Sequence, residues 1–111
     1  MNVKQGDIIK LNLDPTSGHE QAGYRPVIVV SNKTYKRTSN MTLICPITHT
    51  NRNNPVHVEL YGTKTTGYVL TDHIRSVDLQ SRPFNFVENI NNDNLLWEIC
   101  DIAQGGIDVE I

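Results

Sequence analysis

The chain has 111 residues, of which 38% are apolar and 20% charged, and its formal net charge at pH 7 is −2. This length fits one domain over residues 1–111, and the composition is that of a folded globular protein rather than a disordered one. No run of about 18 apolar residues is present, which excludes a transmembrane helix. Residues 1–14 carry charged and amide side chains where a signal peptide needs an apolar core, so we expect a cytoplasmic protein.

The charge is distributed unevenly along the chain. Residues 1–52 hold seven Lys or Arg and three Asp or Glu, a balance of +4. Residues 53–111 hold three Lys or Arg and nine Asp or Glu, a balance of −6, which together give the −2 of the whole chain. A basic half can face phosphate groups, but an uneven solvated surface would give the same counts, so both interpretations stay open.

The first half of the chain predicts three strands. Residues 7–14 alternate apolar and polar side chains, which predicts a half-buried strand, and the β-branched run at 26–32 predicts a strand buried on both faces. The polar stretch 35–40 is typical of a connection. Residues 41–48 predict the third strand, in which Pro46 requires an edge position, a bulge or the strand end.

The second half predicts three short strands followed by a helix. The strands are expected at residues 56–60, 68–71 and 74–77. A turn cluster at 49–54 precedes the first of them, a Gly/Thr-rich hairpin connection at 61–67 follows it, and Asp72 and His73 separate the last two.

A helical stripe marks the C-terminal region. It consists of Leu95, Leu96, Ile99, Ile102 and Ala103. Asn91 or Asn92 can cap its start, and Gly105–Gly106 can end it. Strands without intervening helices exclude parallel βαβ units, so we expect a small, strongly bent antiparallel sheet or barrel with a helix packed on it.

Cys45 and Cys100 each lie in an apolar run, 55 positions apart. The chain has no CxxC motif and no Cys/His cluster with metal-binding spacing. We therefore interpret the two cysteines as buried reduced thiols, and we expect neither a metal site nor a cofactor.

The loop before the second strand carries unusual chemistry. Arg25 stands directly before Pro26, which favours an extended conformation for Arg25 at the mouth of the strand. Its permanently charged guanidinium suits an anion such as phosphate, although a surface ion pair with Glu20 is the alternative. Thr48 ends the third strand and could donate its hydroxyl to a phosphoryl oxygen, or serve only as a turn residue.

The loop also contains His19, and four predicted strands later come Asp72 and His73. Each alone is more typical of a solvated loop than of a site. If strand ends bring together a cation, a hydroxyl, a carboxylate and an imidazole, the set fits metal-free RNA cleavage. In that reaction the 2′-hydroxyl attacks the neighbouring phosphorus, which requires a base, an acid and donors for the added negative charge.

Four segments resemble the MazF/PemK/Kid toxin family in order and spacing. They are "GDIIKLNLDP" at 6–15, "DPTSGHEQAGYRPVIVVS" at 14–31, "ICPIT" at 44–48 and "GYVLTDHIRSVD" at 67–78. The resemblance implies a mainly β fold, a small SH3-like antiparallel barrel (PemK/MazF/CcdB-like) with a C-terminal α-helix. It also implies a homodimeric toxin of a type II toxin–antitoxin system.

Such toxins are sequence-selective, metal-independent endoribonucleases that cut single-stranded RNA, mRNA included, and leave 2′,3′-cyclic phosphate and 5′-hydroxyl ends. A cognate antitoxin neutralises them by threading a flexible segment over the RNA-binding surface.

The resemblance also implies roles for five residues. Arg25, in the family's G-x-R-P motif, would stabilise the phosphorane, and Thr48 would hydrogen-bond a non-bridging oxygen. Glu20 would accept the 2′-hydroxyl proton or hold Arg25. His19 and Asp72 match residues of the Kid branch and are further catalytic candidates.

Two positions depart from the family pattern. Leu70 stands where the Kid branch has an arginine, which favours the Arg25/Thr48 mechanism, and His73 replaces a common glutamine. We expect the loops 35–40 and 49–54 to select the RNA sequence, with Tyr35 as a residue that could stack on a base. The RNA-binding candidates are Gln21, Tyr24, His49, Asn51, His73 and Arg75.

Three alternatives differ in function class. A CcdB-like toxin would bind a protein such as DNA gyrase without enzymatic activity. An SH3-like module for proline-rich peptides would need an aromatic groove, and Trp97, the single tryptophan, lies in the predicted helix. An inactive homologue that only sequesters the antitoxin is the third.

Overall fold

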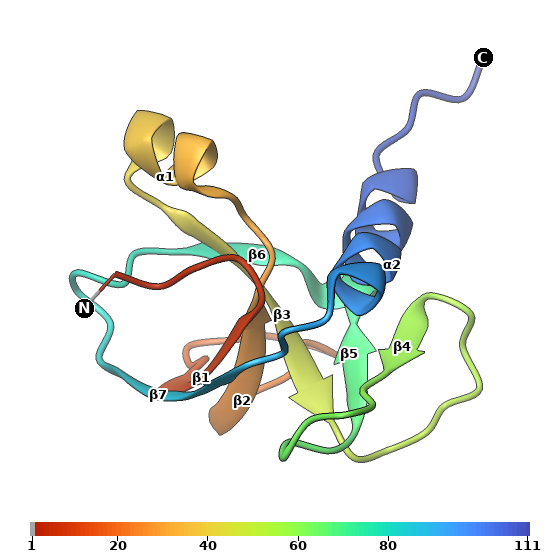
Figure 1. The fold of residues 1–111 in the computed structure, drawn as a ribbon, viewed down its shortest axis with the longest axis horizontal. Helices are drawn as coiled ribbons and strands as arrows, with labels where there is room; N and C mark the ends of the chain where they lie inside the picture. The colour runs from red at the N-terminus through yellow and green to blue at the C-terminus, as the bar shows by residue number, and fades with distance from the viewer. Residues whose placement is uncertain (1) are drawn as a thin grey trace.

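A computed structural model describes residues 2–111 and shows a bent antiparallel sheet with a short helix at one end and a longer C-terminal helix against one face (Figure 1). The elements are β1 (Asp7–Asn12), β2 (Tyr24–Val29), α1 (Lys33–Ser39), β3 (Thr42–Thr48), β4 (His57–Glu59), β5 (Tyr68–Leu70), the 3₁₀ helix η1 (Thr71–His73), β6 (Arg75–Val77), β7 (Phe84–Asn89) and α2 (Asp93–Gly105). The predicted class, mainly antiparallel β with a C-terminal helix, is confirmed.

The strand order is β4-β5-β3-β2-β1-β7, and β6 also pairs with β3. Along one side of β3, Thr42–Ile44 pair with β6, whereas Ile47 and Thr48 pair with β5. Pro46 falls between these two partner strands, so its missing N–H removes no bond from either of them. The sequence predicted an edge, a bulge or a strand end here, and the gap between two partners achieves the same result.

The two ends of the strand path are joined by the side chain of Glu88 on β7. Its carboxylate accepts hydrogen bonds from the backbone N–H of Lys64 (3.1 Å) and from the N–H and hydroxyl of Thr65 (2.7 and 2.8 Å). Both donors lie in the connection between β4 and β5. The sheet therefore curls toward the shape of a barrel through a carboxylate bridge.

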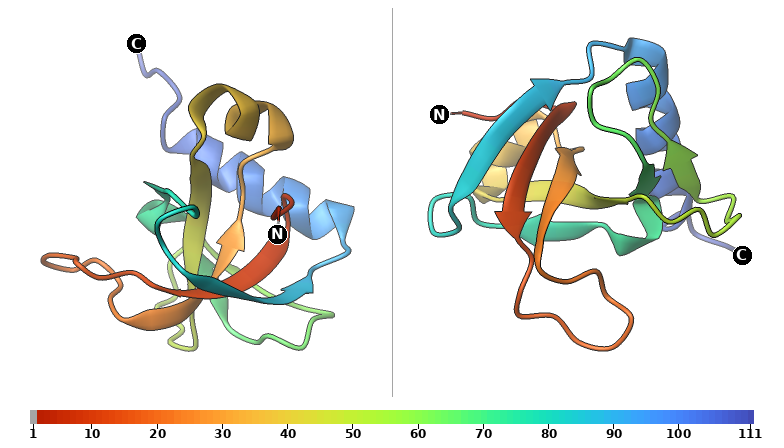
Figure 2. Two further views of the ribbon diagram at one scale, coloured as in Figure 1. Left: turned by 90° about the vertical axis from the view of Figure 1, so that its left-hand side faces the viewer. Right: turned by 90° about the horizontal axis from the view of Figure 1, so that it is seen from below.

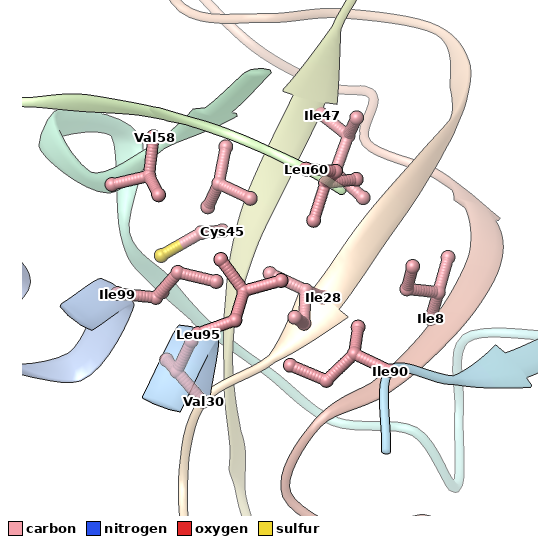
Figure 3. Packing of buried hydrophobic residues seen from close by; sticks show 11 residues of the cluster. Ile8, Ile28, Val30, Cys45, Ile47, Val58, Leu60, Ile90, Leu95 and Ile99 are labelled. Carbon is pink, nitrogen blue, oxygen red and sulfur yellow. The ribbon is translucent and has the colours of Figure 1, made fainter. Parts of the chain in front are cut away.

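Helix α2 packs on the sheet through the predicted stripe (Figure 3). Asn92 caps the helix by accepting a hydrogen bond from the Leu95 N–H (3.0 Å), and both Leu95 and Ile99 are fully buried. Cys45 lies in the same cluster as a free thiol, and burial raises its pKa to about 12. Cys100 is free but only half-buried. No helix within residues 2–111 is both long and apolar enough to span a bilayer.

Two elements differ from the sequence prediction. Residues 33–39 form helix α1 instead of a polar connection, because Asn32 caps the start and Asn40, with φ of 60°, closes the end. This helix has no buried residue, so it lacks the apolar periodicity that predicts a helix. Strand β7 was not predicted, because Phe86 and Val87 are both exposed and its apolar side chains do not alternate cleanly between two faces.

Candidate active site

The loop 13–23 leaves the sheet between β1 and β2 (Figure 2), and its base is closed by hydrogen bonds. The Leu13 N–H donates to the Gly23 carbonyl (2.9 Å), and the Asp14 carboxylate accepts from the Gly23 N–H (3.2 Å). From β6, the Arg75 guanidinium donates to the Leu13 carbonyl (2.9 Å). These bonds therefore hold the start of β2 in a defined position relative to β1 and β6.

The sheet register brings Arg25 and Thr48 to the same place. Val27 of β2 pairs with Pro46 of β3, and the same antiparallel register extended by two residues puts Arg25 opposite Thr48. The start of β2 and the end of β3 lie at one edge of the sheet (Figure 1). Both side chains line one hollow of about 450 Å³, here called the Arg25 hollow. Its other polar lining residues are Tyr24, His49 and Thr66.

Both side chains are held so that donors remain free. The Arg25 Nε donates to the Ala22 carbonyl (2.6 Å), and within residues 2–111 its two terminal nitrogens form no intramolecular hydrogen bond. Thr48 is only 6% exposed, and its Oγ1 accepts from the Thr50 N–H (3.3 Å). That bond orients the hydroxyl as an acceptor and leaves its proton available. An oxyanion in the hollow would thus meet a charged fork and a hydroxyl donor.

Gly67 fixes the backbone behind Thr48 and was missed as a site residue. Strand β5 pairs Tyr68 with Thr48, and a Cβ on Gly67 would lie 2.5 Å from the Thr48 carbonyl oxygen. The φ of Gly67 is +126°, a region that side-chain-bearing residues rarely adopt. The sequence shows only a glycine ending a hairpin connection, so the pairing register was needed to find its role.

A second hollow of about 320 Å³, here called the Asp72 hollow, is lined by the other side of the same loop. Six of the predicted site residues lie there, namely His19, Glu20, Gln21, Asp72, His73 and Arg75. Pro46 of β3 lines this hollow and Thr48 lines the Arg25 hollow, so the two are neighbours along β3. Asn51 lines neither of them and is exposed on the following loop, where its side chain accepts from the Asn53 N–H (2.9 Å).

Glu20 is an exposed carboxylate with its own local partner. Hydrogen bonds from the backbone N–H and the hydroxyl of Ser17 (2.9 and 3.2 Å) lower its pKa, and the charges of Arg75 and His73 lower it further. Within residues 2–111 it forms no ion pair with Arg25, whose Nε binds Ala22 instead. Glu20 is therefore ionised at neutral pH and belongs to the Asp72 hollow.

His57 is a second residue that sequence reasoning missed. Its Nε2 lies 3.0 Å from Asp72 Oδ1, and its side chain is 6% exposed. Its Nδ1 is buried without a hydrogen-bond partner, and a carboxylate can only accept, so the proton sits on Nε2 and donates to Asp72. His73 Nε2 lies 4.0 Å from the same oxygen. The pairing of His57 with Leu70 across β4 and β5 creates this contact, which no local pattern reveals.

Residues 4–96 match the family model described as PemK-like, MazF-like toxin of type II toxin-antitoxin system. The chain belongs to this family. The predicted endoribonuclease toxin of a type II toxin–antitoxin system is thereby confirmed, and the CcdB-like alternative is not favoured.

Relatives of this PemK/MazF-family chain agree in sequence and in structure. It is 38% identical over 77 residues to the endoribonuclease toxin MazF of Escherichia coli (strain K12), a match covering 69% of each chain. MazF of Deinococcus radiodurans has a similar structure, with a TM-score of 0.83 at 30% identity over 95% of this chain and 96% of that one. A MazE–MazF structure from the same organism gives a TM-score of 0.77 at 30% identity over 95% of each chain.

One departure from the family pattern now has a structural explanation. Leu70 is fully buried in β5, whereas the Kid branch has an arginine at the matching position. The cation that lines the Asp72 hollow here is Arg75, and one of its nitrogens is already bound to the Leu13 carbonyl. Of the two arginines that line the two hollows, Arg25 is therefore the one whose terminal nitrogens form no hydrogen bond within residues 2–111.

Proposed function

We propose that this toxin cuts single-stranded RNA, mRNA included, at a selected sequence in the cytoplasm, through attack by the 2′-hydroxyl and without a metal ion. One observation carries the proposal: Arg25 and Thr48 line the same hollow, and each keeps a donor that is free of intramolecular hydrogen bonds. Such donors are worth most where charge develops in a transition state.

The chemistry follows from these two side chains. The 2′-oxygen forms a bond to phosphorus, the bond to the 5′-oxygen breaks, and the products are a 2′,3′-cyclic phosphate and a 5′-hydroxyl. Arg25 keeps its proton, because a guanidinium is not deprotonated in proteins, and neutralises the charge on the phosphorane through its terminal nitrogens. Thr48 donates its hydroxyl proton in a hydrogen bond to a non-bridging oxygen.

Proton transfer is assigned to the Asp72 hollow. One group there takes the proton of the 2′-hydroxyl, and another gives a proton to the leaving 5′-oxygen. Glu20 is ionised and exposed, which suits a base, while the imidazoles of His19 and His73 are the other groups lining this hollow that can give or take a proton. Asp72 stands between His57 and His73 and can orient either imidazole.

RNA contacts are assigned to the polar residues around the two hollows. Tyr24 is 57% exposed, and its hydroxyl accepts from the Asn85 side chain (2.6 Å), so its ring is a fixed surface for a base. Gln21, His49, Asn51, His73 and Arg75 supply further donors and acceptors for base edges and phosphates.

The proposal includes two protein partners. A cognate antitoxin would cover this edge of the sheet, in keeping with the MazE–MazF complexes of the Deinococcus relative. A second copy of the chain would form a homodimer, and large exposed apolar side chains such as Trp97 (75%) on α2 offer surface for it.

The test is to incubate the purified protein with a long RNA in EDTA and to map the cut sites and their end groups. Cuts at one short motif with 5′-hydroxyl ends support both the reaction and its mechanism. Cutting that requires a divalent ion, or that leaves 5′-phosphate ends, would overturn the mechanism. A folded protein that cuts no RNA but binds a protein target would restore the CcdB-like alternative.

A further inference from the structure

A third hollow, of about 680 Å³, lies at the opposite end of the sheet from Arg25 and Thr48. It is enclosed by the segment before β1, by α1, and by the connection between β6 and β7. Helix α1 and the end of β3 stand at opposite ends of the sheet in Figure 1. This cavity is here called the α1 hollow, and neither the catalytic chemistry nor the fold requires it.

Positive charge converges on the α1 hollow. Lys4, Lys33, Lys36 and Arg37 line it, and no carboxylate does. Within residues 2–111 none of the four forms an ion pair. Lys36 Nζ donates to the Asn40 carbonyl (3.0 Å) and Arg37 Nη2 to the Thr34 hydroxyl (3.4 Å), which are both neutral acceptors. Four cations around one cavity without a counter-charge favour an anionic ligand.

The interior of the α1 hollow is apolar and partly aromatic. Val3, Leu79 and Phe84 line it and pack, half-buried, on the core cluster of this face. Gln80, whose side chain ends in an amide, also lines it, and the Thr42 hydroxyl in its wall is buried without a hydrogen-bond partner. A ring for stacking, an amide for a base edge and cations for phosphate are the features of single-stranded RNA sites.

The α1 hollow and the Arg25 hollow lie at opposite ends of β2 and β3, and the residues between them on that face, Val27 and Ile44, are fully buried in the core. On β3, Thr42 and Thr48 are six positions apart and therefore on the same face, at a separation of roughly 20 Å. On β2, Val29 lines the α1 hollow and Arg25 lines the other, four positions apart and again on one face. A strand of RNA several nucleotides long can span this separation over the surface of the protein, because the core closes the face itself between the two hollows.

We infer that the α1 hollow binds a nucleotide of the same single-stranded RNA, several positions from the bond that is cut. The inference rests on the proposed function, because it extends the substrate site beyond Arg25 and Thr48. The inference assigns an RNA ligand to cations of the basic first half of the chain. It also predicts that affinity grows with RNA length on one side of the cut.

The experiment uses the full-length protein and two RNAs: the shortest one that the protein cuts, and the same RNA extended on each side in turn. Lys36→Ala and Arg37→Ala remove charge from the α1 hollow. Lys10→Ala is the matched control. Lys10 is exposed on β1, and its neighbours Ile9 and Leu11 both point into the core cluster that lies beneath the α1 hollow, so the Lys10 side chain points to the opposite face. Binding is measured by fluorescence anisotropy on RNAs with a 2′-deoxy residue at the cut, over a range of salt.

The wild type and Lys10→Ala should bind one extended RNA more tightly than the short one. Lys36→Ala and Arg37→Ala should lose about tenfold in affinity for that extended RNA. The slope of log affinity against log salt should fall by about 0.7 for each phosphate that the variant no longer neutralises. Binding of the short RNA, which does not extend to the α1 hollow, should be equally tight in the wild type and in both variants.

Three results would overturn the inference. The first is equal affinity of variants and wild type for the extended RNAs, and the second is an equal loss in Lys10→Ala. The third is unchanged RNA binding with weakened binding of an acidic peptide or with a changed oligomeric state by light scattering, which would assign the hollow to a protein. If the wild type cuts no RNA at all, the proposed function fails instead.

Discussion

The Arg25 hollow and the Asp72 hollow share the loop 13–23 and differ in kind. The first presents donors fixed by the backbone, since Arg25 is bound to Ala22 and Thr48 to Thr50. The second gathers titratable side chains, among them Glu20 and Asp72, and Asp72 is in turn bound to His57. In the proposed mechanism the two hollows have different roles: the Arg25 hollow stabilises charge, and the Asp72 hollow transfers protons. The loop 13–23 contributes residues to both.

The largest expected effect on catalysis comes from a substitution in the Arg25 hollow. Arg25→Ala should lower kcat/KM about a thousandfold, since it removes the charged fork that faces the phosphorane. The fold should survive, because Arg25 is only half-buried. RNA cleavage assays together with circular dichroism check this. Near-normal cutting by a folded Arg25→Ala protein would remove Arg25 from the mechanism. It would also refute the assignment of charge stabilisation to the Arg25 hollow.

The hydroxyl beside it should matter less. Thr48→Ala should cost about a hundredfold in kcat, the typical loss for one transition-state donor. Thr48→Ser keeps the hydroxyl and serves as the matched control, with activity close to that of the wild type. If the Ser and Ala variants cut RNA equally slowly, the methyl group and its packing matter at this position and not the donor.

The backbone support of Thr48 can be tested through Gly67. Gly67→Ala should lower the free energy of unfolding by roughly 1–3 kcal/mol and should reduce cutting, because its Cβ collides with the Thr48 carbonyl. Gly62 also has positive φ (+72°), but a methyl group there would meet no atom within 4 Å, so Gly62→Ala separates backbone strain from the collision. Urea unfolding and cleavage rates measure both variants, and equal losses would refute the collision.

Substitutions at Asp72 and at its partner His57 should have smaller effects on kcat, and the effects of the two should be coupled. His57→Ala should lower kcat about tenfold, a size typical for two side chains in contact, if His57 acts by orienting Asp72. His57→Gln can still donate to Asp72 and should recover part of the loss. A double-mutant cycle with Asp72→Asn decides the matter, because additive losses would show that His57 acts independently of Asp72.

The smallest expected effect is a shift in the pH at which cutting is lost on the acid side. Since its hydrogen bonds lower the Glu20 pKa from the usual 4.5, a Glu20 base stays ionised as pH falls and is lost only below the ordinary glutamate range. Cutting should then stay constant through mildly acidic pH, and Ser17→Ala should move the acid limb upward. A pH–kcat/KM profile with an acid limb near neutrality would assign the base to His19 or His73 instead.

Local patterns in the sequence were enough for most elements and for the family of the chain. Alternation, continuous apolar runs and the turn residues between them predicted the strands up to β6, and the apolar stripe with Asn92 predicted α2. The segment around Arg25 and the one ending at Thr48 carried the family resemblance. These features depend on residues close together in the chain, where periodicity, capping and turn chemistry act.

The tertiary structure alone decided which residues share a cavity. Strand register set Arg25 opposite Thr48, brought His57 to Asp72 and pressed Gly67 against Thr48. Helix α1 formed through its caps without an apolar face, and its cations then met those of the N-terminal segment around the α1 hollow. These contacts join residues far apart in the chain, and they depend on how strands pair and curl, which no short segment specifies.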